Sequence, residues 1–261
     1  MRLTTIHLVY FSATFTTRKI ARMLAETFGL PVIQHDITRE TPDEDIVLNK
    51  PGDLLIAGVP VYAGRVPALA SDALRRFKGH GTPAIAMCAY GNRDYDDALL
   101  ELKDIIEDNG FKTIAAGAFV AQHSIFPQVG NGRPDTKDEL LIKRFAHECQ
   151  EKLASVEDPS ALSEPKVKGH KPYKKPQGVP LHPEGDADTC TRCGTCAKEC
   201  PTHAIPLEKP YKTDGKRCIS CGHCIAICPQ HSRRYTGLLY KTFGGIFAKS
   251  NSTRKEPEWF L

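Results

Sequence analysis

The chain has 261 residues, a formal net charge of +4 and 41% hydrophobic residues. This length accommodates one good-sized domain and a smaller one. The charge is too mild to indicate nucleic-acid binding. The N-terminus lacks the pattern of a secretory leader, and no apolar run reaches the length of a membrane span, so we expect a cytoplasmic protein with no membrane span.

Strand and helix patterns alternate along residues 1–154. The third predicted strand is apolar on both faces, which is typical of a parallel sheet covered by helices. The alternation predicts an α/β fold with a doubly wound parallel sheet. In the order 2-1-3-4-5, a ligand would lie at the carboxyl ends of strands one, three and four. The predicted strands are residues 3–11, 31–37, 53–61, 82–89 and 112–121, and the later helices run from about 67 through 77, across 99–106 and over 138–153.

A turn rich in hydroxyl side chains follows the first predicted strand and precedes a helix. A helix N-terminus offers unpaired N–H groups and the positive end of the helix dipole, so this turn predicts a site for a phosphate monoester. Ser and Thr also cap helices without any ligand, and that interpretation stays open. The residues of the turn are Ser12, Ala13, Thr14, Phe15, Thr16 and Thr17.

Two more unusual loops follow the third and fourth predicted strands. Because the carboxyl ends of parallel strands meet at one edge of a sheet, we expect all three loops to form one site. His123 and the Gly/Pro-rich loop 126–134 follow the fifth strand, where a lone histidine is more often structural than catalytic. The second loop contains Tyr62, Ala63, Gly64 and Arg65, and the third contains Tyr90, Gly91, Asn92, Arg93, Asp94 and Tyr95.

Residues 155–187 are rich in proline and lysine and have no helix or strand period, which predicts an extended linker. Its lysines either attract an acidic partner or keep the segment solvated. Residues 235–261 contain several large aromatic side chains, and we expect this tail to cover the cysteine-rich part or to join it to the N-terminal domain.

Eight of the ten cysteines form two copies of the pattern C-x-x-C-x-x-C-x-x-x-C-P. This is the spacing of bacterial two-cluster ferredoxins, in which the fourth cysteine of each run binds the other cluster. Paired C-x-x-C units also bind zinc, and cysteines can form disulfides, but zinc needs only two such pairs and nothing indicates an oxidising compartment. The predicted [4Fe-4S] ligands are Cys190, Cys193, Cys196 and Cys228 for one cluster, and Cys218, Cys221, Cys224 and Cys200 for the other.

Residues 1–154 resemble a flavodoxin, and the whole chain resembles the flavodoxin-ferredoxin fusion proteins of anaerobes. The resemblance rests on the complete cysteine motif and on the three loops. It implies a flavodoxin-like domain that binds FMN and a smaller α+β ferredoxin domain over 188–234. The phosphate of FMN would lie on the first loop and its ring between the other two. Tyr95 would stack on the ring, and Gly64 would reorient its peptide near the flavin N5.

Two features depart from the flavodoxin pattern. Phe15 and Thr16 replace the usual glycine and asparagine, which places a bulky side chain where the backbone must curl around a phosphate. Arg65 and Arg93 flank the expected ring, where flavodoxins are commonly acidic. As a hypothesis, these two cations stabilise the flavin hydroquinone anion; alternatively, they pair with Asp94, Asp96 or Asp97.

These features together predict electron transfer between redox partner proteins through FMN and two [4Fe-4S] clusters. One alternative is a flavin-dependent reductase of a small-molecule acceptor, with Arg65, Arg93, His123 and loop 126–134 around its pocket. Another is a ferredoxin joined to a docking domain that has lost FMN. No nicotinamide fingerprint is present, and the sequence names neither donor nor acceptor.

Overall fold

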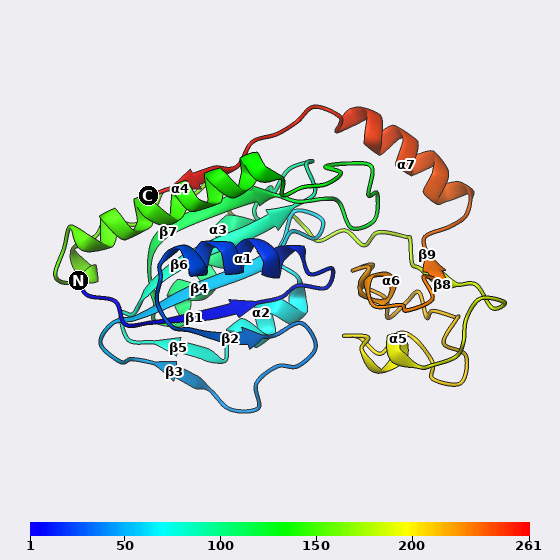
Figure 1. Cartoon of the computed structure of the whole chain (residues 1–261), viewed down its shortest axis with the longest axis horizontal. Coiled ribbons are helices and arrows are strands. Elements are labelled where there is room, and N and C mark those ends of the chain that lie inside the picture. The colour runs from blue at the N-terminus through cyan, green and yellow to red at the C-terminus, as the bar shows by residue number, and fades with distance from the viewer.

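The computed structural model describes residues 1–261, and its centre is a six-stranded sheet (Figure 1). Five strands are parallel in the order β2-β1-β4-β6-β7, and β10 pairs antiparallel with β7 at the edge. The predicted order 2-1-3-4-5 is therefore confirmed. The strands are β1 (Thr5–Tyr10), β2 (Val32–Asp36), β4 (Asp53–Pro60), β6 (Pro83–Tyr90), β7 (Lys112–Val120) and β10 (Glu258–Phe260).

Helices cover both faces of this sheet. The helices α1 (Thr16–Thr27) and α4 (Thr136–Ala154) enclose one hydrophobic core, and α2 (Ala68–Leu74) and α3 (Ala98–Asp108) enclose the other. The strand β6 is buried along its whole length, as expected for a strand covered on both sides. The three loops that follow β1, β4 and β6 consequently meet at the carboxyl edge of the sheet.

A small second sheet was not predicted. The strands β3 (Ile46–Leu48) and β5 (Phe77–Gly79) pair in parallel beside α2. The helix predicted to continue through Phe77 ends at Leu74, because Phe77 pairs with Ile46 and is almost completely buried. An apolar residue fits either a helix or a strand, and this distant pairing decides between them.

The cysteine-rich part is a small α+β unit beyond the carboxyl ends of the parallel strands (Figure 1). It contains two helices of one turn each, which carry cysteines, and one short antiparallel ladder. A single 3₁₀ turn, η1 (Pro159–Ala161), lies in the linker. The elements of the unit are β8 (Glu184–Gly185), α5 (Thr195–Lys198), α6 (His223–Ala226) and β9 (Arg233–Arg234).

The C-terminal tail joins the two parts of the molecule. Its helix α7 (Leu238–Ser250) leads back to the sheet, where β10 pairs with β7. On the way, Tyr240 stacks on Tyr235 and on Phe126 of loop 126–134, with ring centroids 5.7 and 5.4 Å apart. The tail is therefore a structural connection, as one of its two expected roles required. None of the helices is both long enough and apolar enough to cross a bilayer.

Trp259 holds the returning strand against α4. Its indole N–H donates to Glu148 at 2.7 Å, its ring packs on Phe145, and Arg144 lies over its face. We expect Trp259→Ala to lower the free energy of unfolding, because these contacts are lost. The loss should be about 2 to 3 kcal/mol, which is less than for a core tryptophan, because the side chain is only partly buried. The matched control is Phe243→Ala, at a tail aromatic that is 55% exposed, with an expected change below about 0.5 kcal/mol.

Urea unfolding followed by circular dichroism measures both variants. Equal losses in the two variants would contradict the role of β10 as an anchor.

Candidate cofactor site

The first loop connects β1 to α1, and Phe15 at the N-cap position provides no side-chain cap. Phe15 precedes the helix with a φ of +66°, in the left-handed region that favours glycine, and its side chain is 40% exposed. Ser12 is buried, and its hydroxyl accepts a hydrogen bond from the N–H of Arg18 at 2.9 Å. The loop therefore holds a bulky residue in a conformation that favours glycine, and phosphate binding by this loop stays a prediction.

The second loop is a tight turn closed by two backbone hydrogen bonds of 3.0 Å between Tyr62 and Arg65. Both central residues have positive φ, 52° at Ala63 and 84° at Gly64. A Cβ atom at Gly64 would overlap the side chain of Asp96, so only glycine fits there without displacing the third loop. The second and third loops are therefore packed directly against each other.

Both arginines of the proposed cationic rim are ion-paired. Arg65 donates two hydrogen bonds to Glu101, at 2.7 and 2.8 Å, and its guanidinium lies over the ring of Tyr173. Arg93 pairs with Asp96, one of the carboxylates considered as its partner. The hypothesis of two free cations beside the ring is therefore wrong for this structure, because each charge is matched by a carboxylate.

Tyr95 is not available for stacking. It is 2% exposed, its hydroxyl donates to Glu258 of β10, and Lys168 of the linker lies 4.8 Å from the ring centroid. Its ring also contacts the edge of Tyr90. The prediction that Tyr95 stacks on a flavin ring is therefore wrong here, because the linker and the tail enclose the side chain.

The tail also fixes the rest of the third loop. The amide of Asn92 donates to the carbonyls of Asn251 and Thr253, both at 2.9 Å, and its oxygen accepts from the N–H of Lys255 at 3.1 Å. The carboxyl oxygen of Asp94 accepts a hydrogen bond from the N–H of Asp96 at 3.0 Å. Segments remote in sequence thus set the shape of this loop.

His123 has a structural role. Its Nδ1 accepts the N–H groups of Ile125 and Phe126, both at 3.1 Å, and the ring packs against Phe247 of α7. A Cβ atom at Gly91 would lie 2.5 Å from this ring. Burial, with a smaller contribution from the Arg93 charge, lowers the pKa of His123 to about 4. Arg65, Arg93 and His123, which the reductase alternative places around its pocket, are thus all paired or packed.

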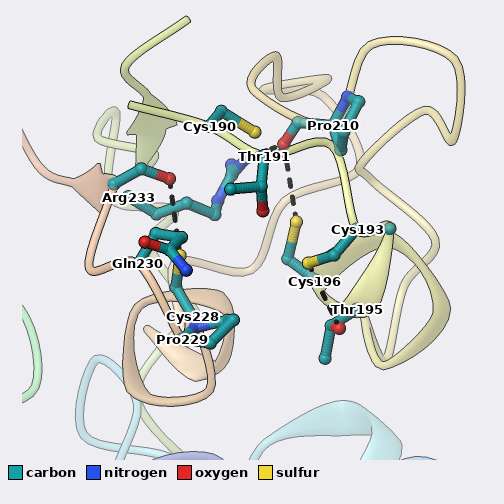
Figure 2. A pocket seen from close by; sticks show the side chains of 12 residues that line it. Cys190, Thr191, Cys193, Thr195, Cys196, Pro210, Cys228, Pro229, Gln230 and Arg233 are labelled. Atoms are coloured by element: carbon teal, nitrogen blue, oxygen red, sulfur yellow. Dashed lines mark hydrogen bonds between the residues drawn. The ribbon is translucent and has the colours of Figure 1, made fainter. Parts of the chain in front are cut away.

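Four of the predicted ligands line one pocket in the cysteine-rich part (Figure 2). We call them the outer set, because Cys193 is exposed. The hydroxyl of Thr195 lies 3.4 Å from the sulfur of Cys193, and that of Ser232 lies 3.4 Å from the sulfur of Cys228. The outer set is Cys190, Cys193, Cys196 and Cys228.

The other four predicted ligands form the inner set, which lies nearer the sheet. Burial, with smaller contributions from the neighbouring thiols of its own set, raises the pKa of Cys221 to about 12, although the N–H of His223 acts in the opposite direction. The sulfurs also accept backbone N–H groups, at 3.3 Å from Ala204 to Cys200 and at 3.4 Å from Ser220 to Cys218. The inner set is Cys200, Cys218, Cys221 and Cys224.

The backbone of the cysteine-rich part repeats with an interval of 28 residues. Arg192 and Ser220 have φ values of 56° and 54°, and His203 and His231 have 50° and 49°. Gly194 and Gly222, both with a φ of 76°, precede the two short helices. The repeated cysteine motif is therefore also a repeated structure, with one copy on each side of the two thiol sets.

The inner half of this part contacts the first loop directly. The Nδ1–H of His223 donates to the carbonyl of Ala13 at 2.6 Å, and the His223 ring meets the edge of the Phe15 ring. Cys221 packs into the core that borders Tyr62. No sequence pattern pointed to His223, because its partner Ala13 lies 210 residues away.

Both expected groups can be tested against these side chains. Eight thiols in two sets, with N–H and hydroxyl donors at the sulfurs, have the chemistry of iron–sulfur ligation. For a flavin phosphate, the start of α1 is suitable, because Phe15 provides no side-chain cap and Ser12 accepts only the N–H of Arg18. The ring half fits less well, because Tyr95 is enclosed.

Comparison with known proteins assigns the cysteine-rich part. Residues 182–229 match the family described as the 4Fe-4S dicluster domain. This part is therefore an iron–sulfur domain, and all ten cysteines are free of disulfides. No curated protein matches the chain significantly.

Solved structures similar to the chain include two flavodoxins and one oxidoreductase. A short-chain flavodoxin associated with a non-canonical PDU bacterial microcompartment has 15% identity, covers 57% of this chain and 98% of its own, and has a TM-score of 0.42. Flavodoxin 2 from Bacillus cereus has 14% identity, covers 57% of this chain and 99% of its own, and has a TM-score of 0.42. An NADH:FMN oxidoreductase in its apo form has 16% identity, covers 62% of this chain and 95% of its own, and has a TM-score of 0.43.

The buried state of His123 predicts a pH dependence of stability. Its folded-state pKa of about 4 lies below the ordinary value of about 6.5, so the unfolded chain binds the proton first and stability falls as the pH drops through this window. Between pH 6.5 and 5 this group should contribute a loss of about 1.5 kcal/mol.

We expect His123→Asn, whose Oδ1 can accept the same N–H groups, to remove this contribution. Urea unfolding at several pH values measures it, with the exposed His147→Asn as the matched control. An unchanged pH slope in His123→Asn would exclude His123 as the source.

Proposed function

The chain joins a flavodoxin-like domain to a 4Fe-4S dicluster domain, as flavodoxin-ferredoxin fusions do, and we propose that it transfers electrons between redox partner proteins through FMN and two [4Fe-4S] clusters. The clusters would exchange single electrons, and a flavin can exchange one or two. The chain's own residues would hold these groups close together and exclude water from the sites between them.

The observation that carries this proposal is the contact between the two parts. His223 lies between two cysteines of the inner set and donates to Ala13 of the phosphate loop at 2.6 Å. Cys221 borders the core next to Tyr62 of the second loop. The inner thiol set thus lies against two of the three loops at the carboxyl edge, which is where a doubly wound sheet binds its ligand.

The two thiol sets differ in their access to solvent. Cys221 and Cys224 of the inner set are buried, whereas Cys193 of the outer set is exposed. We infer that electrons pass between the flavin site and the inner cluster within the chain, and between the outer cluster and a partner protein at the surface. Proposed ligands are the eight cysteines already assigned to the two sets.

A second candidate function is supported by the closure of the third loop. Tyr95 is covered by the linker and by β10, and Phe15 occupies a left-handed position in the phosphate loop. These features favour a first domain that serves as a docking module without flavin. The small-molecule reductase gains no comparable support, because the residues of its pocket are paired or packed.

Cofactor analysis of the anaerobically purified protein tests the proposal. We expect about eight irons and eight acid-labile sulfides per chain, as two four-iron clusters require, together with one FMN. A reductive titration followed by visible absorbance should then show both chromophores. About four irons would contradict the two-cluster assignment. Eight irons, with no flavin taken up from added FMN, would favour the docking function.

Phe15 allows a sharper test of the flavin site. Phe15→Gly should stabilise the chain by about 1 kcal/mol relative to Phe15→Ala, because only glycine adopts a positive φ without strain. We expect FMN to bind Phe15→Gly at least as tightly as the wild type, measured by quenching of flavin fluorescence. Phe15→Ala removes the ring but keeps the strain of a positive φ, so the comparison with Phe15→Gly shows the effect of the strain alone. If none of the three proteins binds added FMN, the flavin part of the proposal fails.

A further inference from the structure

Arg233 is a buried charged residue where the 28-residue repeat has an apolar one. The equivalent position in the first copy is Ile205, which is 5% exposed and packs with Cys196 and Cys224. Arg233 is only 2% exposed. Burial of a guanidinium is unfavourable unless a negative charge lies close to it.

The hydrogen-bond acceptors of Arg233 are all uncharged. The guanidinium donates to the carbonyls of Pro210 and Pro183 and to the hydroxyl of Thr213. Its Nε is buried without any partner among the protein atoms. The adjacent Arg234, in contrast, is exposed and pairs with Asp186. The charge of Arg233 therefore has no protein counter-ion among its hydrogen-bonded neighbours.

The position of the guanidinium relates it to both thiol sets. Figure 2 shows the side chain extending from β9 into the outer set, toward Pro210, and Arg233 lines that pocket together with all four outer cysteines. The strand β9, which carries Arg233, also packs against α6, which carries Cys224 of the inner set. A single positive charge thus lies at the outer set and close to the inner one.

We propose that Arg233 is a counter-charge shared by the two cluster sites, and that it raises the reduction potential of both. Each reduction step adds one electron to a site and neither forms nor breaks a bond, so the added negative charge is stabilised by the nearby cation. The electron comes from the flavin site or from a partner protein. This inference rests on the proposed function, because it requires both clusters.

Neutral and charged substitutions separate charge from hydrogen bonding. Arg233→Gln removes the charge but keeps hydrogen-bond donors, and Arg233→Ile introduces the residue that the first repeat has at the equivalent position, Ile205. Arg233→Lys keeps the positive charge but replaces the planar guanidinium by an ammonium group. Two controls leave the buried charge in place. Arg234→Gln removes the exposed neighbouring cation, and Thr213→Val removes one hydrogen bond of Arg233.

The readout is a mediated redox titration of the whole protein, followed by visible absorbance and by electron paramagnetic resonance of the reduced clusters. Iron and acid-labile sulfide are measured first. In neutral variants that keep about eight irons, both one-electron steps should move to lower potential. The ratio of reduced to oxidised cluster at a fixed potential should fall at least about tenfold, which is 59 mV for one electron.

Arg233→Lys and both controls should stay within about threefold of the wild type. Unmoved potentials in a fully loaded neutral variant would overturn the proposal, as would a shift confined to one cluster or an equal shift in Arg233→Lys. If the neutral variants lose iron, Arg233→Lys decides. If Arg233→Lys keeps about eight irons and wild-type potentials, the positive charge at this position is needed. If Arg233→Lys also loses iron, Arg233 has a purely structural role. A wild type without two clusters would instead contradict the proposed function itself.

Discussion

The arrangement of this molecule depends on one contact, in which the turn before α6 lies on the loops at the carboxyl edge of the parallel sheet. A sheet of this kind leaves its strand ends open, and ordinarily a ligand and solvent fill that edge. Here His223 donates to the carbonyl of Ala13, and Cys221 packs beside Tyr62. Two thiols of the set closest to the sheet, Cys221 and Cys224, are therefore buried, while Cys193 of the other set is exposed.

The same edge is tightened by segments with no cofactor ligands of their own. The linker contributes Lys168 over the ring of Tyr95, and its N–H groups at His170 and Lys174 donate to the carboxylate of Asp97. The tail contributes three backbone contacts to Asn92. These interactions hold the third loop against the linker and the tail.

Features that depend on short-range patterns were predictable from the sequence. The cysteine spacing predicted the four thiols that line one pocket, and the buried β4 and β6 runs predicted the parallel sheet. Features that depend on distant partners were not. Tyr95 looked like a ring-stacking residue because its partners Lys168 and Glu258 lie 73 and 163 residues away. Comparing the two cysteine repeats would have revealed Arg233 opposite Ile205.

The return of the chain through β10 changes how the cysteine-rich part is attached. It leaves the sheet after α4 and comes back to the β7 edge, so in topological terms it is an insertion within the α/β domain rather than an appendage at its end. Two covalent connections restrain its orientation, one on each side. A cut in the linker would leave it held by the other connection. On the proposed function, the clusters would therefore not swing out on a tether, a partner would bind at the outer set, and electrons would pass within the chain at fixed geometry.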